Sequence, residues 1–272
     1  MIINGIVLEP GVVVENVQLT GKKINMAMLS GARIIGSDFS DSEMRYAKLG
    51  QAVLNNSIFD RVDFSGAYLV QAKMIGSNFN QAVFIGADLD QAVLIMADMS
   101  DVSLINVQLN DADLRGVNLQ RASLMDSSVQ NTKLQYANMS ETVLQKTDFS
   151  ASDMRGVTLM LADVRWSNLS QCVLDYAELY QASLIQAIFQ GASLSHTNLE
   201  RCNLMEADLS NANFSDANLS RSNLQKAKFN NTNLSNADLS GANLTGTGLT
   251  FEQLSYVKSL NGTTMPDGSV HR

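Results

Sequence analysis

The sequence is poor in the residues that build metal sites, disulfide-linked folds and membrane spans. Its 272 residues include 2 cysteines, 2 histidines, 2 prolines and 1 tryptophan, and aromatic residues make up only 6%. A four-ligand Cys/His zinc site therefore cannot form without carboxylates, and a fold held by several disulfides is excluded. No apolar stretch approaches the roughly 18 residues that a membrane-spanning helix requires.

The charge balance excludes further classes. The chain carries 27 acidic and 19 basic residues, for a net charge of −8, and has no basic block. Because phosphate neutralisation needs clustered Lys and Arg, direct nucleic-acid binding is not expected. The opening segment lacks a basic region and its apolar run is broken by Asn4 and Gly5, so it does not resemble a signal peptide. We expect a cytoplasmic protein with no cofactor, no bound metal and no membrane partner.

What the sequence does have is a period of five. Every residue whose number ends in 4 or 9 is apolar from Val14 to Leu249, which makes 48 positions. Two residues earlier, the side chain is Ala, Ser, Thr, Val or Cys at 47 of 48 positions, and Lys22 is the exception. A period of five matches neither a helix nor a continuous strand. Within one unit, however, small–x–large fits three residues of strand, and the two following residues, mostly polar or glycine, fit a turn.

This pattern predicts a solenoid whose successive coils pair as parallel strands. Phe39, Phe59 and Phe79 recur at an interval of 20 residues, as do Phe64 and Phe84. Because coils in register stack like residues on one another, we expect four five-residue units in each coil.

The repeat carries a family resemblance. The motif A-(D/N)-L-x-x occurs verbatim with its first three residues at 87–89, 112–114, 207–209, 217–219, 237–239 and 242–244. The sequence resembles the pentapeptide repeat family over about nine-tenths of its length, and its closing MPDGSVH is similar to the tail of cyanobacterial members. The resemblance implies an all-β, right-handed quadrilateral parallel β-helix. The 48 units would make about 12 coils, with a length of about 58 Å at ~4.8 Å per coil.

Both ends of the repeat predict caps. We expect residues 1–11 to cover the first coil and residues 12–249 to form the β-helix. Residues 250–253 have the form of a capping box, which predicts a capping helix over 250–260, followed by a polar tail over 261–272. Lys22 predicts an irregular first coil, or else an ammonium group that reaches solvent along its stem; we favour the irregular coil.

Residues capable of catalysis do not gather in the pattern. Cys172 and Cys202 occupy the small inward position, where a buried, unreactive thiol is expected. His196 falls at a corner and His271 in the tail, so neither is placed as a base for a nucleophile. Carboxylate pairs on an outward surface are expected to be solvated. The sequence therefore predicts no enzyme and no catalytic residues.

Outward apolar residues form columns when the sequence is projected on a 20-residue coil. Exposed apolar residues are common on strands and need no special role. Columns over several coils instead indicate a protein interface, with aromatic anchors at corners, and their clustering in the first two-thirds of the chain favours this interpretation. The candidates are a first strip (Ile35, Val53, Ile75, Val93, Ile95, Met96), a second strip (Val83, Ile85, Ile105, Met125) and the corner residues Tyr136, Tyr176, Trp166 and Tyr180.

We expect a non-enzymatic scaffold or regulator that binds a partner protein or a second copy of itself. The family resemblance also implies an alternative, a DNA mimic that regulates or protects a type II topoisomerase such as gyrase. The charge of −8 permits this alternative. The outward column from Asp38 to Asn138 argues against it, because it contains Ile58 and several asparagines among its aspartates.

Overall fold

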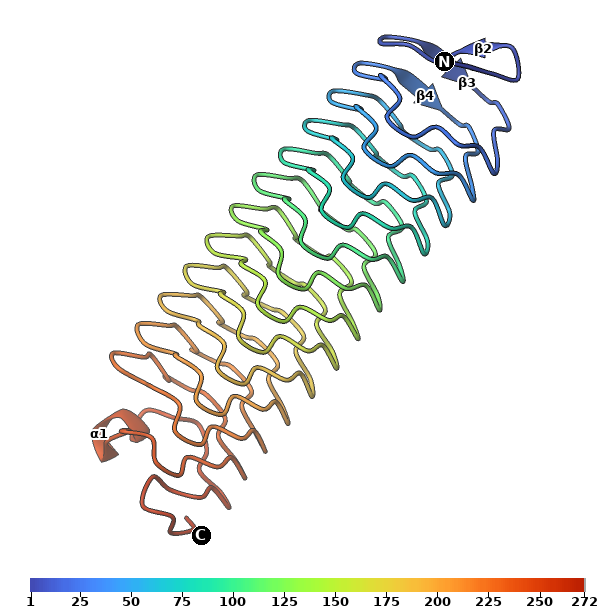
Figure 1. Ribbon diagram of the computed structural model, residues 1–272. Coiled ribbons are helices and arrows are strands. Elements are labelled where there is room, and N and C mark those ends of the chain that lie inside the picture. The colour runs from blue at the N-terminus through green and yellow to red at the C-terminus, as the bar shows by residue number, and fades with distance from the viewer. Residues whose placement is uncertain (272) are drawn as a thin grey trace. The chain divides into compact units, whose positions relative to one another are not determined.

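The computed structural model describes residues 1–271, and the chain divides into two compact units, unit 1 (Met1–Asn138) and unit 2 (Met139–Arg272). Within each unit the chain winds into coils that lie on one another (Figure 1). In unit 1, parallel pairing joins residues 20 apart, beginning with Val13 and Arg33 and continuing with Gln18 and Asp38. In unit 2 the same spacing joins Val143 to Asp163. Bridges recur every five residues, so each coil has four sides, and the expected four-unit parallel coil is confirmed.

Regular strands are few and short. Most sides contribute one bridging residue, so the expected three-residue strands are wrong for most of the chain. The chain turns away at a corner two residues after each bridge, which leaves no room for a longer ladder. The strands are β1 (Ile2–Ile3), β2 (Ile6–Val7), β3 (Val13–Glu15) and β4 (Arg33–Ile35), and the one helix of residues 1–271 is α1 (Phe251–Leu254).

The backbone of each five-residue unit is almost fully hydrogen-bonded. In the unit 71–75, the N–H groups of Gln71, Lys73 and Met74 donate to carbonyls of neighbouring coils at 3.0, 2.8 and 2.7 Å. The N–H of Ala72 closes the corner by donating to the Leu69 carbonyl at 2.9 Å. Four of the five donors are thus used by the main chain alone, and the fifth needs a side chain.

That fifth donor explains the Asp or Asn of the repeat. The Ser100 N–H donates to Asp98 Oδ1 at 3.0 Å, and the Gln120 N–H donates to Asn118 Oδ1 at 3.2 Å. Where the side has no Asp or Asn, one from the preceding coil can replace it: the Ile75 N–H donates to Asn55 Oδ1 at 2.9 Å. The outward polar residue therefore satisfies the backbone at the corner, as short Asx side chains commonly do.

Corner residues whose numbers end in 1 or 6 adopt left-handed backbone angles. The sequence predicts such φ values for glycine, asparagine and aspartate, but the structure also has them at Tyr46 (φ 56°), Leu161 (φ 60°) and Trp166 (φ 61°). A left-handed residue at the third position, with a bond across the turn, is typical of a type II turn. Each non-glycine residue there costs roughly 1 kcal/mol, offset by hydrogen bonds such as that from the Leu161 N–H to the Tyr180 carbonyl at 3.1 Å.

The core consists of the two inward positions of each unit. All 48 large inward positions are buried, which confirms the period of five. In unit 1, Phe59 stacks between Phe39 and Phe79 at centroid distances of 5.6 and 5.1 Å. Lys22 keeps the register, because the next residue pairs with Glu43. The expectation of an irregular first coil is therefore wrong: Lys22 is half-exposed because no coil precedes it.

The C-terminal segment departs from the prediction. Thr250 and Gln253 form the expected capping box, but α1 is only four residues long and does not extend to 260. Residues beyond it are not all tail, since Asp238 pairs with Ser259 and Asn243 pairs with Thr264, a spacing of 21 rather than 20. Thr263 and Met265 repeat the small–x–large pattern one residue out of register and are buried. No helix of residues 1–271 is suited by length and composition to cross a membrane.

Candidate interaction surface

Part of the first predicted strip forms a continuous apolar group. Ile75 and Ile95 lie on adjacent coils, because the residue after Ile75 donates its N–H to the Ile95 carbonyl at 3.1 Å. Val93 lies on the same side two residues before Ile95, and Met96 is a corner residue that is 69% exposed. We call Ile75, Val93, Ile95 and Met96 cluster A.

The other two members of that strip are separated from cluster A. Asn55 occupies the coil between Ile35 and Ile75 and accepts the Ile75 N–H. Val53 pairs with Arg33 on one side and Lys73 on the other, so its neighbours along the ladder are charged. The first strip is therefore shorter than predicted.

The second predicted strip is continuous. It has Ile85, Ile105 and Met125 at equivalent positions on three consecutive coils. The Gly86 N–H donates to the Ile105 carbonyl, and the Asn106 N–H donates to the Met125 carbonyl, both at 3.0 Å. Val83 lies two residues before Ile85. We call Val83, Ile85, Ile105 and Met125 cluster B. Clusters A and B are two sides of the coil apart, so a single flat partner surface cannot cover both.

The predicted aromatic corners of unit 2 are each engaged with a neighbour. The Trp166 Nε1–H donates to Gln186 Oε1 at 2.7 Å, and a guanidinium, that of Arg165, lies 5.0 Å from the indole ring. Tyr176 stacks on His196 at 5.0 Å. Arg201 Nη1 donates to the Tyr180 hydroxyl at 3.0 Å. In unit 1, Tyr136 is 78% exposed.

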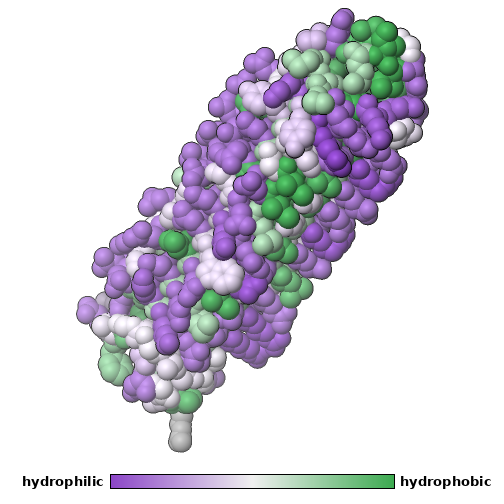
Figure 2. Space-filling model, viewed as in Figure 1, coloured by the Kyte–Doolittle hydropathy of each residue, from purple (hydrophilic) through white to green (hydrophobic). Residues whose placement is uncertain are grey.

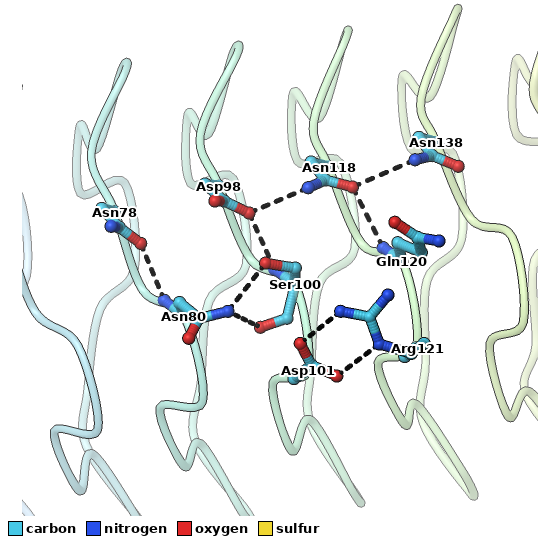
Figure 3. A network of polar contacts seen from close by, with 9 residues as sticks. All are labelled: Asn78, Asn80, Asp98, Ser100, Asp101, Asn118, Gln120, Arg121 and Asn138. Carbon is cyan, nitrogen blue, oxygen red and sulfur yellow. Dashed lines mark hydrogen bonds and ion pairs between the residues drawn. The ribbon is translucent and has the colours of Figure 1, made fainter.

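One polar side of unit 1 is satisfied by its own side chains (Figure 3). The Asn138 amide donates to Asn118 Oδ1 at 3.2 Å, and the Asn118 amide donates to Asp98 Oδ1 at 3.0 Å. On the same side, Asn80 Nδ2 donates to Ser100 Oγ at 2.9 Å. A partner would have to break these bonds before forming its own, so this side offers less binding energy than the apolar clusters.

Ion pairs within and between coils neutralise many of the aspartates. Arg115 binds Asp113 through both carboxylate oxygens at 2.8 and 2.7 Å. Burial alone would raise the pKa of Asp113, but hydrogen bonds from the Arg115 side chain and backbone outweigh it and lower the pKa. Burial and the nearby Asp38 and Asp98 raise the pKa of Asp60, although the Arg61 guanidinium acts in the opposite direction.

Catalytic groups are not assembled in the described chain. Burial raises the pKa of the Cys172 and Cys202 thiols to about 12 each, so thiolates are scarce at neutral pH. Residues 1–271 hold no group of three His, Cys, Asp or Glu side chains placed to bind a metal ion. His196 stacks on Tyr176, and its Nε2 lies 4.0 Å from Asp216 Oδ2.

The surface view places the apolar residues in groups rather than evenly. Figure 2 shows several groups among mainly hydrophilic residues, one of them at the N-terminal hairpin. Prediction from the sequence missed several exposed apolar residues near that end, among them Ile2, Val7, Met26 and Met28. The signal for the first two was present, because Asn4-Gly5 between apolar pairs is typical of a tight hairpin that would orient them together.

Stacked four-sided coils of five-residue units define this chain as a repeat solenoid. Two family models agree with that description. The pentapeptide repeat region model matches residues 102–179, 162–239 and 180–259. The model of eight-copy pentapeptide repeats matches residues 27–61, 42–81, 63–101 and 82–121. The chain belongs to the pentapeptide repeat family.

Solved structures of the same family resemble the chain at low identity. HetL, a protein involved in heterocyst differentiation regulation in the cyanobacterium Nostoc sp. PCC 7120, is 26% identical over 96% of this chain and 92% of its own, with a TM-score of 0.38. A protein of the Arabidopsis thaliana thylakoid lumen is 28% identical over 47% of this chain and 86% of its own, with a TM-score of 0.32.

A third structure is QnrB1, a plasmid-mediated fluoroquinolone resistance protein. It is 21% identical over 92% of each chain, with a TM-score of 0.30. Comparison with curated protein sequences produced no match.

Proposed function

We propose that this chain is a non-enzymatic protein-interaction module that acts as a scaffold or regulator. The observation that carries the proposal is cluster B, in which apolar side chains at equivalent positions occupy three consecutive coils of a regular ladder. The hydrogen bonds of the ladder hold the three coils in register, so these side chains are presented on a fixed backbone. Aligned apolar side chains on a rigid support favour binding, because little conformational entropy is lost when a partner covers them.

The proposal is tested by capture of partners from a native cell extract. The double variant Ile85→Asp/Ile105→Asp should reduce the recovery of specific partners at least tenfold, as measured by quantitative mass spectrometry. Ser65→Asp is the matched control, because it adds a charge to the same column one coil earlier and removes no apolar side chain. Circular dichroism must show the same fold in all variants. Equal recovery by wild type and the double variant would contradict the proposal for cluster B.

Cluster A is the second candidate surface, and it is tested separately. The double variant Ile75→Asp/Ile95→Asp should leave cluster B intact because the two clusters lie on different sides of the coil. Loss of partners in this variant alone would assign the function to cluster A. We propose four aromatic corner residues as secondary anchors: Tyr136, Tyr176, Trp166 and Tyr180. The three in unit 2 must first give up their contacts with neighbouring side chains before they can contact a partner.

A DNA mimic acting on a type II topoisomerase is the alternative function. It is favoured by one side of unit 1, where Asp38, Asp60 and Asp98 share a surface. The ion pairs from Arg61 to Asp41 and from Arg121 to Asp101 weaken that negative potential. A gyrase supercoiling assay tests this function, and unchanged supercoiling at micromolar protein would exclude it.

The finer architecture is part of the same proposal. We propose about 12 right-handed coils from the 48 repeat positions. We also propose that residues 1–11 cover the first coil, and that the segment from Thr250 onward covers the last. Leu8 and Leu254 support these caps because both are buried. A cytoplasmic location, expected from the sequence, completes the proposal.

A further inference from the structure

The N-terminal segment forms a β-hairpin with a two-residue turn. β1 and β2 pair antiparallel, with Ile2 opposite Val7 and Ile3 opposite Ile6. Asn4 and Gly5 form the turn with φ values of 51° and 81°. Positive φ at both central residues is the geometry of a type I′ turn, which suits the twist of a hairpin.

The hairpin is apolar on both faces. Ile3 and Ile6 are half-buried, and Leu8 is 2% exposed, so one face packs on the protein. Ile2 and Val7 share the opposite face and are 70% and 46% exposed. A hairpin with one face in water ordinarily alternates apolar and polar residues. Here the positions that alternation assigns to polar residues hold Ile and Val, which indicates that the outer face is covered in a larger assembly.

The backbone at Ile2 is placed to pair with another strand. The Leu8 N–H donates to the Met1 carbonyl at 2.7 Å, and the Met1 amine donates to the Leu8 carbonyl at 3.1 Å. Because bonded and non-bonded pairs alternate in an antiparallel ladder, the N–H and C=O of Ile2 and Val7 point away from the hairpin. An outward N–H and C=O beside exposed apolar side chains is the arrangement that recruits a further strand.

Charge determines which occupant fits this edge. Residues 1–8 contain no charged side chain, and the one charged group of the segment, the Met1 ammonium, is bound to the Leu8 carbonyl at 3.1 Å, so no side-chain charge opposes the approach of a second hairpin. The first coil, by contrast, carries Lys22 and Lys23, and charged residues of this kind protect edges against pairing. The side of the first coil that holds these lysines is thus protected, whereas the hairpin edge is not.

We propose that the hairpin pairs with the hairpin of a second copy of this chain. Under a two-fold axis, β1 of one copy lies antiparallel to β1 of the other. The N–H and C=O of each Ile2 then bond across the axis, and the exposed Ile2 and Val7 side chains share one face of a four-stranded sheet. Such an isologous contact is closed, so it produces dimers rather than fibres.

The contact is small and the dimer is correspondingly weak. Eight residues from each copy bury much less than the roughly 1,200 Å² of a standard stable interface. We expect a dissociation constant on the order of 10 to 100 μM, with reversible exchange.

Sedimentation velocity over a range of roughly 5 to 500 μM tests the equilibrium. The wild-type chain, with any tag placed at its C-terminus, should shift from monomer to dimer across this range. Ile2→Asp/Val7→Asp should stay monomeric, because four carboxylates would meet in one sheet. The matched control Gln51→Asp/Gln91→Asp adds the same charge at exposed corners outside the hairpin and both clusters, and it should dimerise as the wild type does. A wild type that is monomeric throughout would overturn the proposal.

A cross-linking variant keeps the test decisive if the charged variant misfolds. Ile2→Cys introduces one accessible thiol, since Cys172 and Cys202 are buried. Mild oxidation should convert at least half of a 100 μM sample to covalent dimer, and Asn56→Cys, exposed in a middle coil of unit 1, should give little. Equal cross-linking of both variants, or none in either, would contradict pairing at β1. Binding of a strand from a different protein, by a wild-type chain that itself stays monomeric, would also contradict the proposed pairing of two copies.

Discussion

At the scale of single residues, the corners determine which side chains the fold accepts. Left-handed backbone angles are shared by glycines and by large residues such as Tyr46 and Met96. A large corner side chain leans over the equivalent corner of the next coil. A Cβ atom at Gly66 would lie 2.5 Å from Tyr46 Cε1, and one at Gly116 would lie 2.5 Å from Met96 Sδ. Glycine at such corners therefore accommodates the preceding residue, in addition to adopting the backbone angle.

A pair of glycine substitutions separates these two roles. Gly66 and Gly86 have φ values of 64° and 66°, but a Cβ at Gly86 meets no atom within 4 Å. Gly86→Ala should cost about 1 kcal/mol, because only the backbone is strained. Gly66→Ala should cost about 1 to 2 kcal/mol more, because the Tyr46 ring must move. Equilibrium denaturation measures both values, and equal losses would show that the ring contact is unimportant.

At the scale of elements, the inward pattern was predictable and the hydrogen bonds were not. The five-residue period could be read directly, because small and large inward residues alternate along one stretch of chain. The role of Asn55 toward the Ile75 N–H depends on a contact 20 residues away, which no local pattern contains. Lys73 and Asn55, which interrupt the first strip, lie 20 residues from Val53 and Ile75, so the interruption emerges only when residues of successive coils are compared. At the C-terminus, the Thr263 and Met265 pair escaped prediction because its register is shifted by one residue.

The capping box of α1 provides a test at this scale. The Gln253 N–H donates to Thr250 Oγ1 at 3.3 Å, and Gln253 Nε2 donates to the Phe229 carbonyl at 3.2 Å. Thr250→Ala should lower the free energy of unfolding by about 1 kcal/mol, because the helix loses its N-cap acceptor. Thr250→Ser keeps the oxygen and should lose only a few tenths of that. If both substitutions had the same effect in chemical denaturation, the cap would not be the source of the stability.

At the scale of the whole molecule, charge is spread rather than concentrated. Unit 1 has 14 acidic and 10 basic residues, and unit 2 has 13 and 9, so each carries a net charge of −4. Most of the basic residues pair with a neighbouring carboxylate, as Arg165 does with Asp163 at 2.6 Å. The surface therefore supports solubility more than the strong negative potential that a DNA mimic requires.

The same pairs make stability depend on pH in a defined direction. The pKa of Asp163 is lowered: burial would raise it, but hydrogen bonds from Arg165 and Gln145 outweigh that effect. A carboxyl group with a lowered folded pKa contributes stability that is complete above its unfolded pKa, about 3.9, and is lost as the pH falls through the folded pKa. The Asp163→Asn variant should therefore lose less stability than the wild type between pH 6 and pH 3.

Asp60 supplies a control of opposite sign. Burial is the main cause of its raised pKa, so its carboxyl favours folding more as the pH falls. Asp60→Asn should lose more stability than the wild type over the same interval. Urea denaturation at several pH values measures both slopes, and identical slopes in the two variants would refute the assignment.

Because a unit has five residues and a coil has 20, the number of residues that precede an outward side chain determines the side of the coil on which it lies. Deleting 20 residues within unit 1 would shorten it by one coil and leave every remaining side chain on its original side. Deleting five would preserve the core equally well, because each unit places the same kinds of residue inward. It would, however, move every following outward residue of unit 1 to the adjacent side, a quarter turn away. Deletion of one unit before cluster B would thus move the cluster to another side of the coil without any substitution. A change in which partner is bound can therefore arise from the length of the chain alone.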